Sequence, residues 1–394
     1  MKKRLLAALL LAALLIPACV SAPSGTPEPS APSGTPAPDS PTPDDPTPTP
    51  TPSPMTPEKL LELEDNAFLA SFDYPKYAAG AAGEAYFSGR WFEKEIEGEL
   101  HHVTVTDGAQ IFFMTEGCTT VDLIFTVITR LETPYYAVSI DGAAPKRHEI
   151  TSGTVTLPDA GRHTVRVVAD SMKENEAKWS QEAGIALKAI EPGEGGRMRA
   201  IVPQNKVIFF YGDSITEGIS VFGANAPRSN SSSTAYPWFT CEKLGAIPYY
   251  IGYSGSGVTV VGSFSPFPDA VDHLSRSRKA DLEVIPDAIV INHGTNDGAG
   301  QSADFRNNLK RALDKIVKYY PGVPVIYMIP FCGNRAEDIA TVCADYADIT
   351  VVPTASWGIS YTDGLHPNRT GAKRAGDKLA AKLKSILGSS FFDV

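Results

Sequence analysis

The chain has 394 residues, of which 43% are hydrophobic and 20% charged, so it is long enough for two folded domains and typical of a globular protein. Its formal net charge of -10 argues against nucleic acid or an anionic membrane surface as the ligand and favours a neutral substrate. Five cysteines in so long a chain are no disulfide framework, and they lack metal-ligand spacing.

Residues 1–19 have the pattern of an export signal. A basic start at residues 1–4 precedes an apolar run at residues 5–16 that is too short to span a bilayer comfortably. The run ends in Ile16-Pro17-Ala18-Cys19, which resembles the lipobox of bacterial lipoproteins. The resemblance implies that Cys19 carries lipid and anchors the protein to a bacterial membrane, on its extracellular or periplasmic face. An ordinary signal peptide cut nearby is the alternative.

Residues 20–57 are mostly Pro, Ser, Thr, Ala, Gly and Asp, a composition that predicts an unfolded segment. Its prolines favour an extended chain of about 3.1 Å per residue, which gives a reach on the order of 100 Å. We interpret the segment as a spacer, because no basic flank favours the alternative of a Pro-rich peptide ligand. A short helical pattern follows at residues 56–70.

Residues 58–195 are predicted to form an all-β domain, because apolar residues alternate with a period of two between turn signals. About seven short strands at this spacing predict an antiparallel sandwich or jelly roll. Such a domain either binds carbohydrate or only packs against its neighbour, and the sequence leaves both open. The expected strands are residues 103–105, 110–114, 121–129, 135–140, 154–157, 163–169 and 184–190.

The Pro- and Gly-rich stretch at residues 191–196 predicts a domain boundary, and residues 196–394 then alternate strands with helices. Such alternation predicts an α/β fold in which a parallel sheet has helices on both faces. The expected strands are residues 207–211, 249–253, 288–292, 323–329 and 349–353, and the expected helices are residues 236–244, 303–320, 335–346 and 370–387.

The first strand of this second domain runs into Gly212, Asp213 and Ser214. Gly212 allows the backbone to bend where a side chain would clash. Asp213 and Ser214 then lie at the carboxyl end of the strand, where open α/β sheets bind their ligands. Ser214 is a candidate nucleophile near the start of the next helix. Helix capping by Ser214 or Asp213 is the alternative.

Three further clusters occupy strand ends or precede the last helix: Gly252-Tyr253-Ser254-Gly255, Gly294-Thr295-Asn296-Asp297 and Asp363-Gly364-Leu365-His366. Each is common by itself, as a glycine turn, a helix cap or a chance Asp-x-x-His. Together with Gly212-Asp213-Ser214-Ile215, and in this order, they resemble the four blocks of the SGNH (GDSL-type) hydrolase superfamily. The resemblance covers roughly residues 200–390.

The resemblance implies a flavodoxin-like three-layer fold and a serine esterase, and it implies no metal or cofactor. Ser214 would be the nucleophile, His366 the base that removes its proton, and Asp363 the group that orients the imidazole. The backbone N–H groups of Ser214 and Gly255 and the side-chain amide of Asn296 would bind the oxyanion of the intermediate. Gly257 is the alternative to Gly255 if the turn is shifted.

Several other residues carry two interpretations each. Asp213 and Asp297 are expected to fix turns rather than to transfer protons. His293 and Trp357 are candidate substrate-binding residues, and a structural role in packing is the alternative for each. Cys332 and Cys343, at the two ends of a predicted helix, either pair in an oxidising compartment or remain thiols.

The domain order narrows the expectation further. A small β-domain followed by an SGNH domain, with Phe87-Ser88-Gly89-Arg90-Trp91 near its start, resembles carbohydrate esterase family 2, whose members remove acetyl groups from plant polysaccharides such as xylan and mannan. Some members lack the triad aspartate, whereas this chain has Asp363. We therefore expect acetylated polysaccharide as the substrate. The alternatives are cell-wall or exopolysaccharide acetyl groups, lipid or thioester acyl groups, and a surface carbohydrate-binding module without activity.

Overall fold

The computed structural model describes residues 76–78, 83–151, 153–298 and 300–393. The predicted export signal, the spacer and the helical pattern at residues 56–70 lie outside the described residues. We call residues 76–200 the β region and residues 207–393 the α/β region, and both belong to one compact unit. Among the described residues no helix is long and apolar enough to cross a membrane.

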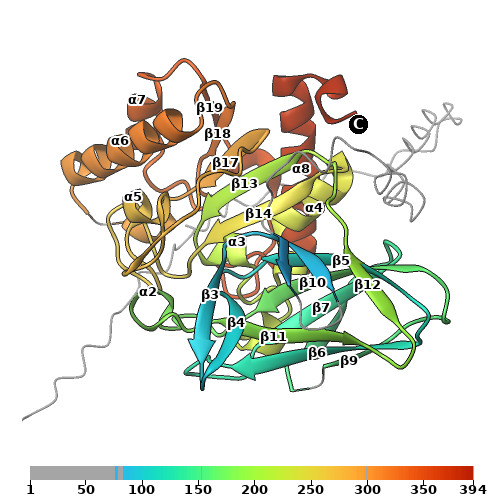
Figure 1. Cartoon of the computed structure of the whole chain (residues 1–394). Helices are drawn as coiled ribbons and strands as arrows, with labels where there is room; N and C mark the ends of the chain where they lie inside the picture. The colour runs from blue at the N-terminus through green and yellow to red at the C-terminus, as the bar shows by residue number, and fades with distance from the viewer. Residues whose placement is uncertain (1–75, 79–82, 152, 299, 394) are drawn as a thin grey trace, which may run out of the picture. The chain divides into compact units, whose positions relative to one another are not determined.

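The β region consists of two antiparallel sheets (Figure 1). Its strands are β1 (Lys76–Ala78), β2 (Glu84–Ser88), β3 (Trp91–Ile96), β4 (Glu99–Thr104), β5 (Gln110–Glu116), β6 (Thr120–Val127), β7 (Tyr135–Ile140), β8 (Lys146–Glu149), β9 (Thr154–Thr156), β10 (His163–Ser171), β11 (Ile185–Pro192) and β12 (Arg197–Ala200). One sheet has the order β1-β2-β5-β10-β7-β8 with β12 also paired to β5, and the other has the order β3-β4-β11-β6-β9. Alternate apolar side chains of both sheets share one core, for example Phe87, Phe113, Leu123 and Val165.

The α/β region is built on a parallel sheet of order β14-β13-β17-β18-β19. Its strands are β13 (Val207–Gly212), β14 (Ile247–Gly252), β17 (Ala288–Asn292), β18 (Val325–Met328) and β19 (Ile349–Val352), and a hairpin adds β15 (His273–Ser275) and β16 (Arg278–Lys279). The α-helices of the described chain are α2 (Lys178–Gln181, in the β region), α3 (Ser214–Glu217), α4 (Tyr236–Leu244), α5 (Phe267–Ala270), α6 (Ser302–Tyr319), α7 (Ala336–Cys343) and α8 (Arg369–Leu387).

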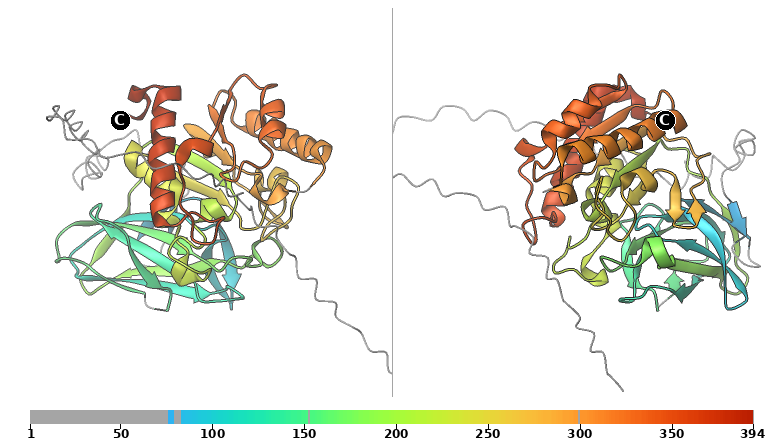
Figure 2. Two further views of the ribbon diagram at one scale, coloured as in Figure 1. Left: turned by 180° about the vertical axis from the view of Figure 1, so that it is seen from behind. Right: turned by 90° about the vertical axis from the view of Figure 1, so that its left-hand side faces the viewer.

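Helices cover both faces of the parallel sheet (Figures 1 and 2). Within β13, Phe209 and Tyr211 pack with the side chains of α5, α6 and α7, whereas Ile208 and Phe210 pack with those of α4 and α8. This division follows from the period of two in a strand, which sends successive side chains to opposite faces. The predicted fold, an all-β part followed by a parallel sheet with helices on both faces, is confirmed.

The stretch at residues 191–196 is a turn within the β region rather than its end. Pro192 ends β11, and a tight turn closed by Gly196 N–H donating to Gly193 O (2.9 Å) leads into β12. β12 pairs with Phe113–Glu116 of β5, beside the part of the same strand edge that β2 occupies. The β region therefore extends to Ala200, beyond the boundary expected at residue 195, because β5 offers an unfilled edge that the local sequence does not reveal.

Candidate active site

The carboxyl ends of three neighbouring strands lie at the same level of the parallel sheet. Gly212 of β13 is in register with Gly252 of β14 on one side and with Asn292 of β17 on the other. The three motif turns that follow these strands therefore emerge at one edge of the sheet, where doubly wound folds bind their ligands.

The turn after β13 shows which of its residues, Asp213 or Ser214, caps the next helix. A Cβ atom at Gly212 would overlap the side chain of Thr216, so only glycine fits there. Asp213 is the cap of α3, because its carboxylate accepts a hydrogen bond from the N–H of Ile215 at 3.0 Å. Burial raises the pKa of Asp213 to about 6. Capping thus falls to Asp213, and the hydroxyl of Ser214 bonds elsewhere.

Ser214, His366 and Asp363 are hydrogen-bonded in a row. The distance from Ser214 Oγ to His366 Nε2 is 2.9 Å, and that from His366 Nδ1 to Asp363 Oδ2 is 2.8 Å. Partial burial acts to raise the pKa of Asp363, but hydrogen bonds from the backbone and ring of His366 and from the N–H of Leu365 outweigh it and hold that pKa below its ordinary value. An ionised carboxylate only accepts, so Nδ1 carries the ring proton and Nε2 is left to accept from the serine.

The turn that carries Asp363 and His366 is held at both ends. Thr362 N–H donates to His366 O at 2.9 Å, and Thr362 Oγ1 donates to the carbonyl of Ser220 at 2.7 Å. Asn368 then caps α8, because its side-chain oxygen accepts a hydrogen bond from the backbone N–H of Gly371, the third residue of the helix. The aspartate and the histidine consequently come from one short loop, as their spacing in the sequence suggests.

The glycine turn after β14 distinguishes Gly255 from Gly257. Gly257 N–H donates to Val260 O at 2.9 Å, so this amide is already engaged. Gly255 has φ +69°, which glycine adopts without strain, and no hydrogen bond within the described chain uses its N–H or that of Ser214. These two amides and Asn296 are the available donors. One N–H of the Asn296 amide donates to Ser256 O at 2.9 Å, which leaves the second N–H for another acceptor.

Asp297 and His293 have structural surroundings. The carboxylate of Asp297 accepts from the N–H groups of Val258 (2.8 Å) and Thr259 (2.7 Å) and so holds the loop after β14. His293 is 1% exposed, its ring is stacked on Phe267 at 4.4 Å, and burial lowers its pKa to about 4. We therefore correct the expectation for His293, which is a neutral core residue out of reach of a substrate.

Trp357 and Cys343 also pack in the interior. Trp357 is 4% exposed and lies 6.1 Å from the ring of Phe331, in the core under α8, so it forms no wall of a substrate cleft. The short helical turn at Ala355–Trp357 directs its side chain inward. Cys343 is a free, buried thiol and is not joined to Cys332.

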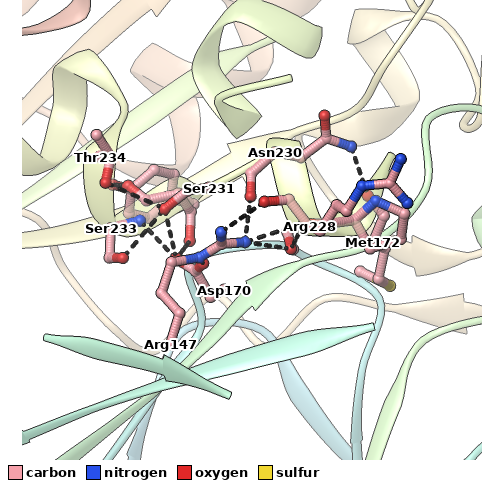
Figure 3. A network of polar contacts seen from close by, with 12 residues as sticks. Arg147, Asp170, Met172, Arg228, Asn230, Ser231, Ser233 and Thr234 are labelled. Atoms are coloured by element: carbon pink, nitrogen blue, oxygen red, sulfur yellow. Dashed lines mark hydrogen bonds and ion pairs between the residues drawn. The ribbon is translucent and has the colours of Figure 1, made fainter. Parts of the chain in front are cut away.

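A polar network between the two regions was not predicted (Figure 3). Arg147 of β8 donates to the carboxylate of Asp170 in β10. It also donates to the carbonyls of Pro227 and Arg228, and both of these distances are 2.9 Å. The other oxygen of Asp170 accepts from the hydroxyl of Ser231 at 3.0 Å. Two side chains of the β region thus fix the loop after α3.

That loop is connected in turn to both halves of the site. Ser231 N–H donates to Gly218 O at 2.9 Å, and Asn230 Oδ1 accepts from Ser220 N–H at 2.8 Å, which joins the loop to the end of α3. The carbonyl of Ser220 accepts from Thr362, next to the aspartate. Single polar residues on strands give no sequence signal for such a network, since their partners are far away in the chain.

Residues 210–374, which contain all four motif blocks, match the GDSL-like Lipase/Acylhydrolase family. The α/β region is a GDSL-type acylhydrolase domain. The predicted resemblance to SGNH (GDSL-type) hydrolases is thereby confirmed, and the matched domain is of the expected enzyme class, the carboxylic ester hydrolases. Within the described residues no group of three or more His, Cys, Asp or Glu side chains is arranged to hold a metal ion.

The chain has curated and structural relatives. It is 26% identical to a cellulase/esterase of Acetivibrio thermocellus over 223 residues, which are 50% of this chain and 27% of that protein, so it spans about a quarter of that relative. A family two carbohydrate esterase from Clostridium thermocellum, solved in complex with cellohexaose, superposes with a TM-score of 0.63 at 19% identity, covering 77% of this chain and 99% of that one.

An acetyl xylan esterase from the rumen bacterium Butyrivibrio proteoclasticus superposes equally well, with a TM-score of 0.63, 17% identity, and coverage of 80% of this chain and 99% of that one. At such identities the likeness establishes a shared fold. The expected two-domain resemblance to carbohydrate esterase family 2 is confirmed at that level.

Proposed function

We propose that this protein is a serine esterase that removes O-acetyl groups from a polysaccharide through an acyl-serine intermediate. The observation that carries the proposal is the row of hydrogen bonds from Ser214 through His366 to Asp363, at 2.9 and 2.8 Å. The acylhydrolase match supports ester hydrolysis, and the two carbohydrate esterases of the same fold support a sugar ester as the substrate.

In the first half of the proposed reaction, Ser214 Oγ attacks the acetyl carbon while His366 Nε2 takes its proton. The carbonyl oxygen becomes an oxyanion, which accepts hydrogen bonds from the N–H groups of Ser214 and Gly255 and from Asn296. The imidazolium then gives its proton to the sugar oxygen as the C–O bond breaks, which releases the sugar hydroxyl and leaves acetyl-Ser214.

In the second half, a water molecule replaces the sugar. His366 takes a proton from the water as its oxygen attacks the acetyl carbon, and the same donors bind the second oxyanion. Collapse of this intermediate returns the proton to Ser214 and releases acetate. Asp363 stays ionised throughout and stabilises the imidazolium. The side chains of the described site supply every proton transfer that ester hydrolysis requires.

The test is acetate release from acetylated xylan, acetylated mannan, O-acetylated peptidoglycan and a lipid ester, with His366→Ala as the control. We expect acetate from a plant polysaccharide, and none from the variant. Preference for peptidoglycan would identify the substrate as cell-wall acetyl groups, and preference for the lipid ester would contradict a sugar ester as the substrate. Binding of a polysaccharide without any acetate release would replace the enzyme by a binding module.

We also propose that the enzyme is exported and anchored through lipid on Cys19, with residues 20–57 as the spacer between membrane and enzyme. The support is the lipobox-like sequence before Cys19 and the Pro-rich composition after it. Metabolic labelling with a fatty acid should mark the wild-type protein and not Cys19→Ser. Equal labelling of both would contradict the anchor.

A further inference from the structure

A lysine of the β region is buried completely beside the nucleophile turn. Lys178, the first residue of the short helix α2, is 0% exposed. Its ammonium bonds the carboxylate of Glu217 and lies 3.2 Å from Asp107 Oδ2. Both carboxylates are themselves about 1% exposed. A charge so far from water requires such partners, and removing one partner leaves a costly unpaired charge.

Burial acts on both carboxyl groups of this cluster in the same direction. It raises the pKa of Asp107 to about 8, against the lowering effect of the Lys178 ammonium, and it also raises the pKa of Glu217. The contact of Lys178 with the α/β region is its bond to Glu217.

Glu217 belongs to the same helical turn as the nucleophile. It is the last residue of α3, which begins at Ser214 and has a single turn. Within this turn the N–H of Gly218 donates to Ser214 O at 3.1 Å. A contact that fixes the carboxylate of Glu217 therefore fixes the direction of the Ser214 N–H, one of the proposed oxyanion donors.

The chain around Lys178 also holds the turn of the second donor. Asn175 N–H donates to Ser254 Oγ at 3.2 Å, and Ser254 is the residue before Gly255. Trp179 N–H donates to Ser263 O at 3.0 Å, and Ser263 N–H donates to Ser254 O at 2.9 Å. One short segment of the β region thus contacts the turns of both backbone donors.

From this geometry we infer that Lys178 is a positioning residue of the esterase: its bond to Glu217 holds the turn of Ser214 against the turn of Gly255, so that their N–H groups meet one oxyanion. The inference rests on the proposed function. It assigns the β region a part in the chemistry, although no side chain of that region is proposed to touch the substrate.

The expected consequence is a loss in kcat with little change in KM. The oxyanion forms only after the substrate is bound, so misdirected donors weaken the binding of the transition state and leave the binding of the substrate unchanged. Since a displacement of about 1 Å costs on the order of 100-fold in rate, we expect the contact to be worth about 10- to 100-fold in kcat.

The experiment compares Lys178→Met/Glu217→Gln with Arg90→Met in the full chain, using an acetylated aryl ester and acetylated xylan. The double variant removes both charges of the ion pair and leaves no unpaired one. Arg90 is the matched control, because it is also a buried cation of the β region, and its short hydrogen bonds go to the carbonyls of Ala270, Val271 and His273, outside the motif turns. Its contact with a motif turn is with the side-chain hydroxyl of Tyr253 at 3.5 Å. Thermal unfolding measures the stability of each variant.

We expect the double variant to have a lower kcat than the wild type on both esters and an unchanged KM. Its affinity for a boronic acid, which mimics the tetrahedral oxyanion, should fall by the same factor as kcat. Arg90→Met should lose stability and keep kcat. If the double variant does not fold, Glu217→Gln alone, which keeps Lys178 paired with Asp107, should show the same split. A folded variant with wild-type kcat overturns the inference. Wild-type protein without esterase activity would instead overturn the proposed function.

Discussion

Two buried cations of the β region, Arg90 and Lys178, contact the α/β region, and they bind different parts of it. Arg90 donates to the carbonyls of Ala270 (2.6 Å) and Val271 (2.9 Å) at the end of α5, and its guanidinium lies 3.5 Å from the hydroxyl of Tyr253. Lys178 instead bonds the carboxylate of Glu217 in the turn that begins with the nucleophile.

The difference lies in the partner rather than in the depth of burial. Carbonyls at a helix end are groups that any fold must satisfy, so Arg90 secures the docking of the two regions. The carboxylate of Glu217 belongs to a motif turn, so Lys178 acts on the geometry of the site. The proposed reacting groups lie in the α/β region, and the β region contacts the turns that carry them. Variants of different residues should therefore affect the chemical step, the direction of the oxyanion donors, or the stability of the protein.

The largest effect is expected for Ser214→Ala. Removal of the nucleophile should lower kcat by about 10⁴-fold or more, because the remaining groups still bind the substrate and its oxyanion but form no acyl-enzyme. Thermal unfolding should change little, since among the described residues the hydroxyl bonds only the imidazole. Activity assays with an acetylated aryl ester measure the loss. Residual hydrolysis near the wild-type rate would assign the chemistry to another residue.

An intermediate effect is expected for Asn296→Ala. This donor belongs to the α/β region, and its amide bonds Ser256 O, so the β region does not hold it. Loss of one oxyanion donor should lower kcat by about 10²- to 10³-fold with KM nearly unchanged. Combined with Lys178→Met/Glu217→Gln, the losses should be less than multiplicative if all three donors bind one oxyanion. Fully independent losses would place Asn296 outside that group.

The smallest effect on activity is expected from Asp107→Asn, whose measurable effect is on stability. The carboxyl of Asp107 titrates at its ordinary value of 3.8 when unfolded and at about 8 when folded. The stability that it contributes is therefore complete below the unfolded pKa and is lost as the pH rises through the folded pKa. Asparagine resembles the protonated form and does not titrate. The free energy of unfolding of the variant should decline less steeply than that of the wild type, by about 1.4 kcal/mol per pH unit over this range.

Chemical denaturation at a series of pH values between the two pKa values measures that slope. The kcat of the variant serves as the control, since asparagine has the shape of the carboxyl group and leaves the bond between Lys178 and Glu217 in place. Identical slopes for wild type and variant would contradict the raised pKa of Asp107 in the folded protein.

The sequence predicted elements best where the apolar period is uninterrupted. The bounds of β7 (Tyr135–Ile140), α4 (Tyr236–Leu244) and β17 (Ala288–Asn292) agree with the expected ones. β8 (Lys146–Glu149) was missed because all of its residues are polar and it pairs only with β7 at the sheet edge. β3 (Trp91–Ile96) was missed for a similar reason, since charged residues interrupt its apolar positions.

The site was predicted to the extent that its residues lie in short motifs. The bonds that join Ser214, His366 and Asp363 connect residues that the resemblance to SGNH hydrolases had singled out. The glycine donor could not be chosen from sequence, because the choice depends on Gly257 N–H being engaged by a carbonyl three residues on. Lys178 carried no signal at all, since an interior lysine is recognised only by its partners, and these are distant in the chain.

The central claim, that Ser214 is the nucleophile of an esterase, is tested most directly by covalent labelling with an alkyl phosphonofluoridate followed by peptide mass mapping. The phosphorus accepts the serine oxygen and loses fluoride, and the tetrahedral adduct resembles the acyl-transfer intermediate. We predict one adduct per chain, on the peptide that contains Ser214, with slow labelling of His366→Ala and none of Ser214→Ala. An adduct on a different residue, or a wild-type protein that hydrolyses esters and yet remains unlabelled at Ser214, would contradict the account.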